Sequence, residues 1–305
     1  MRAEENMADA LGRCVSPATL IRRDEPLAGH TTLRVGGPAD VYVEPASEAD
    51  LAGVLTFCRE RGLAFFVLGR GSNLLVRDGG FRGVAICLAG APFGRIQPDG
   101  ERLRCGAGAK LKNVAVEAKR NGLSGLEFLE GIPGSVGGAL RMNAGAMGGA
   151  TFDVVESVRL MDPAGTVREL TPKEMDVAYR CCATLKSHIA LSAVFHGAPA
   201  PRAAIEKRMK EFSEKRWASQ PAAPSAGCMF KNPAAVPAGR LIDELGLKGT
   251  RVGGAVVSAE HGNFIVNEGG ATAREVLELI GILQRRAKAE RGIDLQTEVE
   301  IIGEP

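Results

Sequence analysis

Two glycine-rich stretches stand out in the chain of 305 residues, and they read Gly69-Arg70-Gly71-Ser72-Asn73 and Gly131-Ile132-Pro133-Gly134-Ser135-Val136-Gly137-Gly138-Ala139. Residues 62–149 hold 20 of the 39 glycines. Glycine weakens helices and strands, so a chain concentrates it where the backbone takes a positive φ or approaches a ligand closely. The two stretches together suit a long ligand with a diphosphate near its middle.

The common nucleotide-binding spacings are missing. The chain has no GxGxxG after a strand and no GxxxxGK[ST], and Gly106-Ala107-Gly108 lacks the third glycine of the first pattern. In residues 69–73, successive backbone N–H groups can instead converge on an anion, and Ser72 and Asn73 add side-chain donors. Tight turns in a sheet-rich fold remain the alternative explanation for both stretches.

The surrounding sequence alternates between strand and helix patterns. Residues 64–68 are a continuous apolar run, as in a buried strand. Residues 47–61 predict a helix that begins after Ser47 and ends before Gly62. Residues 1–28 are expected to be a flexible or helical lead-in, and residues 125–149 are too rich in glycine for one regular element. Further strands are expected at 40–45, 84–88, 102–105, 154–160, 167–170, 189–195 and 293–302, and further helices at 111–121, 203–217, from 241, and from the capping box at 272–275 to Gly292.

Composition excludes several classes of protein. With 45% hydrophobic and 24% charged residues, the chain is an ordinary globular protein. The net charge of +2 gives no electrostatic argument for a nucleic-acid or membrane partner. No apolar run reaches the roughly 18 residues of a membrane helix, and residues 1–14 are not a secretory signal. Seven scattered cysteines without zinc spacing predict reduced thiols, a cytoplasmic location and no metal site.

Motifs beyond the glycine stretches occur in a fixed order along the chain. They are residues 31–39, Met142-Asn143-Ala144-Gly145-Ala146, Tyr179-Arg180, Gly227-Cys228-Met229-Phe230-Lys231-Asn232-Pro233, residues 261–267 and Glu298-Val299. In this order they resemble the UDP-N-acetylenolpyruvoylglucosamine reductases (UDP-N-acetylmuramate dehydrogenases), which are bacterial cell-wall enzymes that use NADPH and FAD. The resemblance covers the chain from about residue 28 to its end.

The resemblance implies an α+β fold of the vanillyl-alcohol-oxidase type. Two subdomains would clasp FAD, and a third α+β domain would cover the substrate. We expect the first subdomain at 20–83, together with the C-terminal strand 296–305, the second at 84–197, and the substrate-binding domain at 198–295. Proline and alanine cluster at 197–201, as at a domain boundary.

The resemblance also implies which residues contact the cofactor. The first glycine stretch would contribute Gly69, Arg70, Gly71, Ser72 and Asn73, the second Gly131, Ile132, Pro133, Ser135, Gly137 and Gly138, and the segment that follows Asn143 and Gly145. The flavin would be held without a covalent bond, and neither stretch contains a histidine that could form one. NADPH would reduce the flavin and leave.

The implied reaction reduces an enol-ether double bond beside a carboxylate. Hydride would pass from flavin N5 to the terminal carbon of the enolpyruvyl group. The growing charge must then be stabilised, and one proton must be donated. The resemblance assigns the first task to Arg180 and Glu298 and the second to Cys228. Burial and a nearby anion would both raise the pKa of Glu298, which favours the protonated form.

The chain departs from the family pattern at two cysteines. Serine is usual at position 228, and a thiol, with a reference pKa of about 8.5, is the better acid. Cys182 also replaces a serine, and we expect it to be structural. From spacing alone, Arg180 would be a surface arginine, Glu298 part of a solvated strand face, and Cys228 a small buried side chain.

Substrate contacts are expected at Tyr179, Lys231, Asn232, Arg216 and Gln220. The chain has only two tyrosines, Tyr42 and Tyr179, so it resembles the short family type without a tyrosine loop after the Tyr-Arg motif. We expect a monomer that binds UDP-N-acetylglucosamine enolpyruvate and NADPH. Two rival functions remain at this stage: a flavin oxidase of the same superfamily that acts on an alcohol or sugar, and a non-catalytic nucleotide-binding protein.

Overall fold

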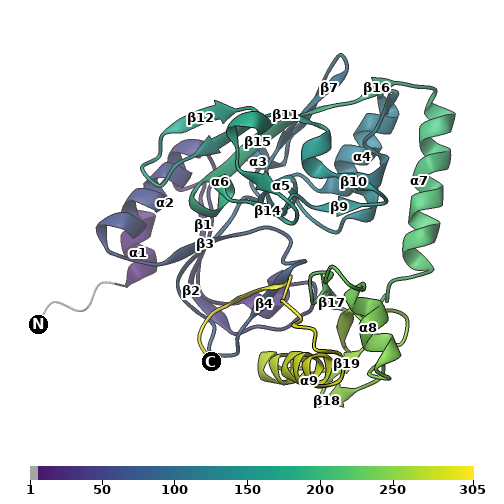
Figure 1. Cartoon of the computed structure of the whole chain (residues 1–305). Coiled ribbons are helices and arrows are strands. Elements are labelled where there is room, and N and C mark those ends of the chain that lie inside the picture. Colours follow the sequence, from purple (N-terminus) through teal and green to yellow (C-terminus); the bar gives the residue numbers. More distant parts are fainter. Residues whose placement is uncertain (1–5) are drawn as a thin grey trace, which may run out of the picture. The chain divides into compact units, whose positions relative to one another are not determined.

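The computed structural model describes residues 6–305 and divides the chain into two compact units, each made of three segments (Figure 1). Of the described residues, the first unit contains 6–23, 41–69 and 83–215, and the second contains 24–40, 70–82 and 216–305. Each unit has its own cluster of buried apolar side chains. The units are described separately below.

A four-stranded sheet with the order β1-β2-β5-β3 lies mainly in the first unit, and residues 24–26, 38–40 and 81–82 of its strands belong to the second. Its strands are β1 (Leu20–Pro26), β2 (Pro38–Glu44), β5 (Phe81–Cys87) and β3 (Phe65–Leu68), with β3 parallel to β5. Helix α2 (Glu48–Glu60) follows β2. The helix begins as predicted, because the Ser47 hydroxyl accepts the Asp50 N–H at 3.0 Å. The apolar face that the sequence predicted is buried.

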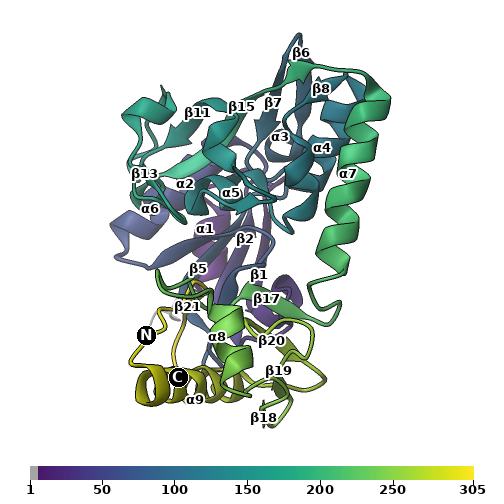
Figure 2. The same ribbon diagram turned by 45° about the vertical axis from the view of Figure 1, so that its right-hand side comes forward.

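The first unit also contains a five-stranded antiparallel sheet, of which β11, β15, β7 and β6 are labelled in Figure 2. Its order is β12 (Val167–Leu170), β11 (Val155–Met161), β15 (Ile189–His196), β7 (Arg102–Gly106) and β6 (Ile96–Asp99). Strand β15 is buried from Ile189 to Phe195 because it is the central strand. That burial explains why its sequence is a continuous apolar run.

The remaining elements of the first unit are short, apart from α4 and α7. The helices are α1 (Met7–Gly12), α3 (Ala91–Gly94), α4 (Leu111–Arg120), α5 (Val136–Met142), α6 (Thr184–Ser187) and α7 (Arg202–Trp217), whose last two residues belong to the second unit. The strand pairs are β8 (Leu123–Ser124) with β16 (Ala198–Pro199), β9 (Gly145–Ala146) with β10 (Gly149–Ala150), and β13 (Val177–Ala178) with β14 (Cys181–Cys182).

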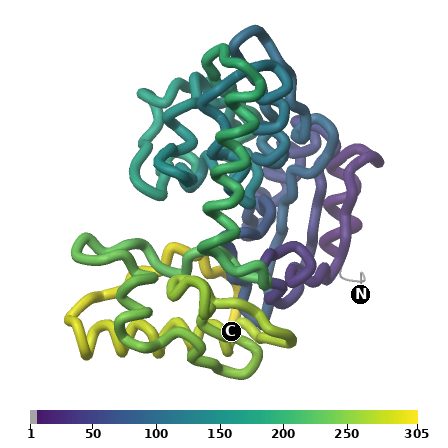
Figure 3. Tube along the Cα trace, turned by 90° about the vertical axis from the view of Figure 1, so that its right-hand side faces the viewer, coloured from purple at the N-terminus to yellow at the C-terminus, as the bar shows by residue number. Residues whose placement is uncertain are grey.

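The second unit has an antiparallel sheet with the order β17 (Ser225–Cys228), β20 (Phe264–Asn267), β19 (Ala255–Val257) and β18 (Arg251–Val252). Its helices are α8 (Ala238–Glu244) and α9 (Ala273–Arg291), and β4 (Leu74–Val76) pairs in parallel with β21 (Glu300–Ile302). Figure 3 shows the green-to-yellow end of the chain gathered around α9. Leu33, Val35 and Leu75 share the buried cluster with α8 and α9, so all three segments build one core.

The capping-box prediction for α9 is confirmed. Thr272 caps the helix, Glu275 completes the box, and Gly292 ends it with a φ of 67°. The apolar face predicted for this helix is buried over its whole length. Among residues 6–305, no helix is long and apolar enough to cross a membrane.

Two sequence predictions were wrong or incomplete. Residues 20–26, expected to be a lead-in, form β1, which the polar sequence hides because it is an exposed edge strand. Residues 125–149 form several short elements, as expected for a stretch too rich in glycine for one regular element, and these include α5 with glycines in its first turn. The strand expected at 293–302 is reduced to β21, because residues 296–299 bond to residues 229–231 instead.

The three-part domain division expected from the sequence differs from the two units formed by the contacts. Residues 84–197 lie in the first unit, and residues 20–83 are shared between both units. Residues 216–295 of the expected substrate-binding domain lie in the second unit with residues 296–305. The three functional parts remain a prediction.

Candidate functional site

The first glycine stretch follows β3 directly and takes a conformation that needs glycine. Gly71 has a φ of 59°, and a Cβ placed on it would lie 2.2 Å from the carbonyl oxygen of His30. The Gly71 carbonyl accepts the Thr32 N–H at 3.1 Å. The backbone of this turn is therefore fixed from within the second unit, where residues 70–73 lie.

The second glycine stretch leads into α5. Ser135 is the N-cap of this helix, and its Oγ accepts the Gly138 N–H at 3.4 Å. Gly137 donates its N–H to the Ala107 carbonyl at 2.7 Å. A Cβ on Gly137 would lie 3.2 Å from the Ala107 Cβ, so glycine allows this close approach.

The two stretches meet at Gly69 and Ser135, both in the first unit. A Cβ on Gly69 would lie 2.8 Å from the Ser135 Oγ. Gly69 and Pro133 are exposed, and Gly137 and Gly138 are partly exposed. This surface, poor in side chains, matches the requirement for close approach of a large cofactor, and a side chain at Gly69 would fill part of it.

Asn143 and Gly145 connect the second glycine stretch to the Tyr179-Arg180 pair. Asn143 ends α5 with a φ of 41°, and its Nδ2 donates to the Ala178 carbonyl at 3.2 Å. Its Oδ1 accepts the Phe152 N–H at 3.1 Å. The side chain of Asn143 therefore has a structural role, and a flavin contact at this position remains a prediction.

Tyr179 and Arg180 form the two-residue tip between β13 and β14. Arg180 has a φ of 54°, and its Nη1 donates to the Gly145 carbonyl at 3.3 Å. The Tyr179 side chain is 64% exposed, and the Arg180 Cζ lies 5.3 Å from the centre of its ring. The hairpin thus places a permanently charged group beside the segment that follows the second glycine stretch.

Cys228 and Glu298 come together in the second unit, although they are 70 positions apart in the sequence. Glu298 donates its N–H to the carbonyl of Met229, the neighbour of Cys228, at 2.8 Å. The pairing continues in the other direction, because Lys231 donates its N–H to the Gln296 carbonyl at 2.9 Å. The two predicted catalytic residues therefore lie on adjacent, hydrogen-bonded segments.

Asn73 ties the first glycine stretch to Glu298. Its Nδ2 donates to the Glu298 carbonyl at 3.0 Å, and its own carbonyl accepts the Glu300 N–H at 3.0 Å. Both backbone polar groups of Glu298 are thus hydrogen-bonded, one to Met229 and one to Asn73. This fixes the backbone from which the Glu298 side chain projects.

Thr32, which lies in the motif of residues 31–39, also belongs to this region, and its position was not predicted from the sequence. Its Oγ1 donates to the Ser225 carbonyl at 2.6 Å, and its N–H binds the Gly71 carbonyl. It therefore joins the first glycine stretch to the strand that carries Cys228. A threonine between two turns gives no sequence signal for such a distant contact.

Four of the five predicted substrate residues fall into two places in the second unit, whereas Tyr179 lies in the first unit. Lys231 and Asn232 are exposed directly after Phe230, and the Asn232 Oδ1 accepts the Ala238 N–H of α8 at 3.0 Å. Arg216 and Gln220 lie at the end of α7, where the Arg216 Nε donates to the Gln220 Oε1 at 3.3 Å. Arg216 also stacks near Trp217, which is 59% exposed.

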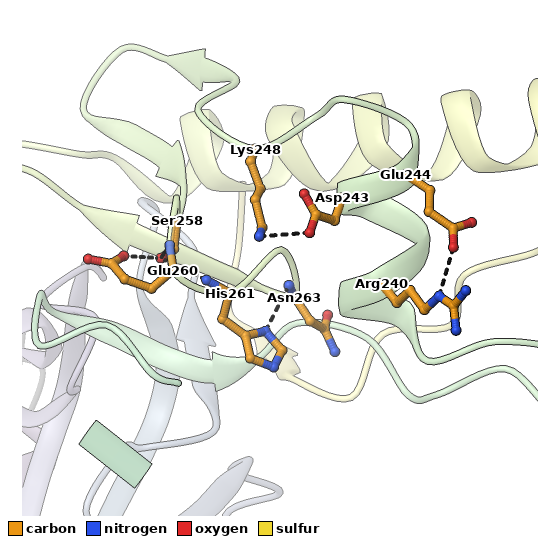
Figure 4. Close-up of polar contacts among 8 residues, drawn as sticks. All are labelled: Arg240, Asp243, Glu244, Lys248, Ser258, Glu260, His261 and Asn263. Carbon is orange, nitrogen blue, oxygen red and sulfur yellow. Dashed lines mark hydrogen bonds and ion pairs between the residues drawn. The ribbon is translucent and has the colours of Figure 1, made fainter. Parts of the chain in front are cut away.

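His261 and Asn263 lie side by side in the second unit and are joined by a hydrogen bond (Figure 4). Asn263 is 2% exposed and bonds to Phe230, and the nearby His261 accepts the Asn263 N–H at 3.1 Å. Burial lowers the pKa of His261, and the positive charge of Lys248 acts in the same direction. Neither residue was predicted to have a role, because the sequence of a turn does not show which of its polar side chains are buried.

Other features lie apart from the predicted residues. A surface hollow of about 410 Å³ in the first unit is lined by residues 124–125, 153–156 and 196–198, none of which was predicted as a site residue. Burial raises the pKa of the Cys182 thiol, and this residue is fully enclosed. Within residues 6–305, no group of three or more His, Cys, Asp or Glu side chains is arranged to hold a metal ion.

Two family models match different parts of the chain. Residues 39–171 match the family described as FAD binding domain, and residues 220–302 match the family described as UDP-N-acetylenolpyruvoylglucosamine reductase, C-terminal domain. A variant of berberine bridge enzyme, 14% identical with a TM-score of 0.50, shares the fold over 64% of this chain. The chain is accordingly an FAD-binding oxidoreductase with the α+β fold of the vanillyl-alcohol-oxidase type.

Full-length relatives give the family. A UDP-N-acetylenolpyruvoylglucosamine reductase of Heliobacterium modesticaldum is 47% identical over 92% of this chain and 90% of its own length. A UDP-N-acetylenolpyruvoylglucosamine reductase of Bacillus velezensis is 42% identical over 93% of this chain and 94% of its own length. The crystal structure of the Thermus caldophilus enzyme matches with a TM-score of 0.80 at 41% identity, over 93% of this chain and 98% of that one. The chain belongs to the UDP-N-acetylenolpyruvoylglucosamine reductase family.

Proposed function

We propose that this protein reduces UDP-N-acetylglucosamine enolpyruvate to UDP-N-acetylmuramate, a step in the synthesis of peptidoglycan precursors, with NADPH as reductant. The observation that carries the proposal is a set of hydrogen bonds that joins Glu298 to Met229, the neighbour of Cys228, and to Asn73 of the first glycine stretch. Cys228, Glu298 and the first glycine stretch therefore lie in one region of the second unit. The family of the chain supports the same reaction.

The residues present fit FAD. The contact between Gly69 and Ser135 leaves a surface that a Cβ would fill. Gly71 is required for a different reason, because a Cβ at this position would overlap the backbone of His30 and Thr31. We propose that residues 69–73 and 131–138 hold the cofactor without a covalent bond, with Asn143 and Gly145 beside them. Bound FAD supplies the hydride that reaches the substrate.

Arg180 and Glu298 would act on the substrate carboxylate. The charge that develops beside this carboxylate needs preorganised donors. A guanidinium can donate two N–H groups to one carboxylate, and the hairpin tip fixes the Arg180 backbone. Glu298, with both backbone groups bonded, would hold its carboxyl group toward the same charge.

Cys228 would complete the reduction. The double bond gains a hydride on its terminal carbon and a proton on the carbon that bears the carboxylate. The proton leaves the thiol of Cys228, and water then returns one to the thiolate. NADPH is oxidised to NADP⁺, so electrons and protons balance. Tyr179, Lys231, Asn232, Arg216 and Gln220 are proposed to bind the rest of the substrate, and the cations among them suit its diphosphate.

The absorption spectrum tests the whole proposal. The purified protein is expected to be yellow, to release its flavin on denaturation, to bleach with NADPH, and to regain colour without oxygen when the enolpyruvyl nucleotide is added. A protein that takes up no FAD contradicts the proposal. A flavin reoxidised by oxygen but not by the nucleotide would instead support the oxidase alternative.

Substitution of Cys228 tests the proton donor. Cys228→Ser is expected to keep activity within about tenfold of wild type, because it retains a transferable proton. Cys228→Ala is expected to lose about 10²–10⁴-fold, the usual contribution of a general acid. The rate of flavin reoxidation by the nucleotide is the measurement. Equal rates in both variants would mean that another group donates the proton.

A further inference from the structure

Asn263 lies behind the strand that carries Cys228 and is 2% exposed. We propose that it is a positioning residue for proton transfer, which fixes the segment between Cys228 and Glu298 through its side-chain amide. The inference rests on the proposed function, since it assumes that Cys228 donates the proton. Asn263 would influence proton transfer through the backbone of residues 229–230, without contacting the substrate.

The amide of Asn263 bonds to both backbone groups of one residue. Its Oδ1 accepts the Phe230 N–H at 2.9 Å, and its Nδ2 donates to the Phe230 carbonyl at 2.8 Å. The Asn263 carbonyl also accepts the Met229 N–H at 2.8 Å. Met229 and Phe230 are buried, so water cannot replace these bonds.

These bonds continue a strand pairing beyond the point where its partner turns away. Cys228 pairs with Phe264 across β17 and β20, and the register is irregular just before it, where Gly227 has a φ of 74°. After Cys228 the partner chain turns at residues 261–263. The amide of Asn263 then takes the place of the next backbone partner. Cys228 thus lies between the irregular strand pairing at residues 225–228 and the segment that the Asn263 amide holds at Phe230.

The same segment sets the position of Glu298. The Met229 carbonyl accepts the Glu298 N–H at 2.8 Å, and the Phe230–Thr297 bridge lies beside it. A shift of residues 229–230 would therefore move the backbone of Cys228 and loosen that of Glu298 together. Misplacement of reacting groups by about 1 Å can cost about 10²-fold in rate.

His261 fixes the backbone of Asn263 in turn (Figure 4). Its Nδ1 accepts the Asn263 N–H at 3.1 Å, and its ring packs edge-on against Phe264 with 4.9 Å between centres. A Cβ on Gly239 would lie 2.8 Å from the ring, so the imidazole is closely confined. The asparagine is consequently held at its backbone by His261 and engages Phe230 with its side chain.

The two half-reactions separate a positioning role from a loss of structure. Reduction of the flavin by NADPH does not use Cys228, whereas reoxidation by the enolpyruvyl nucleotide does. For Asn263→Ala we expect about a 10- to 100-fold slower reoxidation and an unchanged rate of reduction, measured by stopped-flow absorbance. Asn263→Asp keeps one acceptor for the Phe230 N–H, so its reoxidation rate is expected to lie between those of the wild type and Asn263→Ala. It also serves as the second variant if the alanine variant does not fold.

Asn267→Ala is the matched control. Asn267 lies on the same strand, β20, and its Nδ2 donates to the Leu33 carbonyl at 3.1 Å, away from Cys228. It should lower stability without slowing either half-reaction more than about twofold. In a Cys228→Ala background, Asn263→Ala should slow reoxidation less than it does in the wild type, because the part of its effect that acts through Cys228 is already lost and only the part that acts through Glu298 remains.

The outcomes distinguish the two proposals. If NADPH reduces the wild-type flavin but the enolpyruvyl nucleotide does not reoxidise it, the proposed function fails and this inference fails with it. If the wild type turns over and Asn263→Ala reoxidises at the same rate, only this inference is wrong. An equal slowing of both half-reactions, or a full additional loss in the Cys228→Ala background, would likewise make Asn263 merely structural.

Discussion

Arg180 combines a proposed catalytic charge with a backbone conformation that suits glycine. Its φ of 54° lies in the left-handed region at the tip of a two-residue hairpin. For a residue with a Cβ this region costs about 1–2 kcal/mol. Strained residues of this kind are often found at functional sites, where the surrounding structure holds them.

Replacing Arg180 by glycine and by alanine separates the two properties. Both variants are expected to lose turnover and to keep FAD, because both lack the guanidinium. Arg180→Gly should be more stable than Arg180→Ala by about 0.5–1 kcal/mol, since glycine relieves the strain at some cost in chain entropy. Denaturant midpoints and steady-state rates measure this. A more stable alanine variant would contradict the strain, and retained turnover would remove Arg180 from the site.

His261 predicts how stability depends on pH. Its folded pKa lies below its ordinary value of about 6.5, first because of burial and also because of Lys248. Below pH 6.5, His261 therefore binds a proton in the unfolded chain but resists binding one in the folded protein. The free energy of unfolding consequently decreases as the pH is lowered. His261→Gln removes this loss, so its unfolding free energy should change less between pH 7.5 and pH 5. Parallel curves for the two proteins would contradict the prediction.

Among the elements, the first glycine stretch shows how two glycines can matter for different reasons. A Cβ at Gly71 meets backbone atoms of His30 and Thr31, whereas one at Gly69 meets only the Ser135 hydroxyl. Gly71→Ala should cost at least about 2 kcal/mol from strain and backbone overlap. Gly69→Ala should cost about 1 kcal/mol, the size of a helix cap, and mainly lower the flavin content.

Denaturant unfolding of the flavin-free proteins and the ratio of flavin to protein test this pair. Ser135→Gly combined with Gly69→Ala serves as the control, because it removes the atom that the new Cβ would meet. A Gly71→Ala protein as stable as the wild type would show that the turn at residue 71 can rearrange.

Sequence patterns over a few residues predicted individual helices and strands well, but they did not predict contacts between residues that are far apart in the sequence. The capping box of α9 could be predicted from the sequence because Thr272 and Glu275 are only three residues apart. The same helix start also uses Asp78, whose carboxylate accepts the N–H groups of Ala273 and Arg274 at 2.8 and 2.9 Å. No sequence pattern joins an aspartate to a helix 195 residues away.

The candidate site follows the same rule. Motif order identified Arg180, Cys228 and Glu298 as candidates. The hydrogen bonds through Met229 and Asn73 that bring Cys228 and Glu298 together came only from the fold. The strand expected over residues 293–302 also misjudged the setting of Glu298, because apolar alternation does not reveal which chain a segment pairs with.

At the scale of the whole molecule, each unit is assembled from three separate segments. Residues 220–302 match a family C-terminal domain. The core around α8 and α9 nevertheless needs Leu33, Val35 and Leu75 from earlier segments. The cap from Asp78 is likewise supplied from outside that range.

A fragment of residues 216–305 is therefore expected not to fold alone. Without the two earlier segments it loses part of its core and the partner strand of β21. Circular dichroism should show no cooperative thermal transition for the fragment, whereas the full chain shows one. A fragment that unfolds cooperatively would contradict the shared core.

The left-handed backbone of Arg180 also bears on how this protein evolves. A single change at the first codon position turns any arginine codon into a glycine codon. If glycine at this position is the more stable choice, a library screened for heat resistance alone will accumulate inactive variants that still bind flavin. Directed evolution of the enzyme should therefore select for nucleotide-dependent flavin reoxidation in every round, and natural sequences with glycine at this position should have lost the reaction.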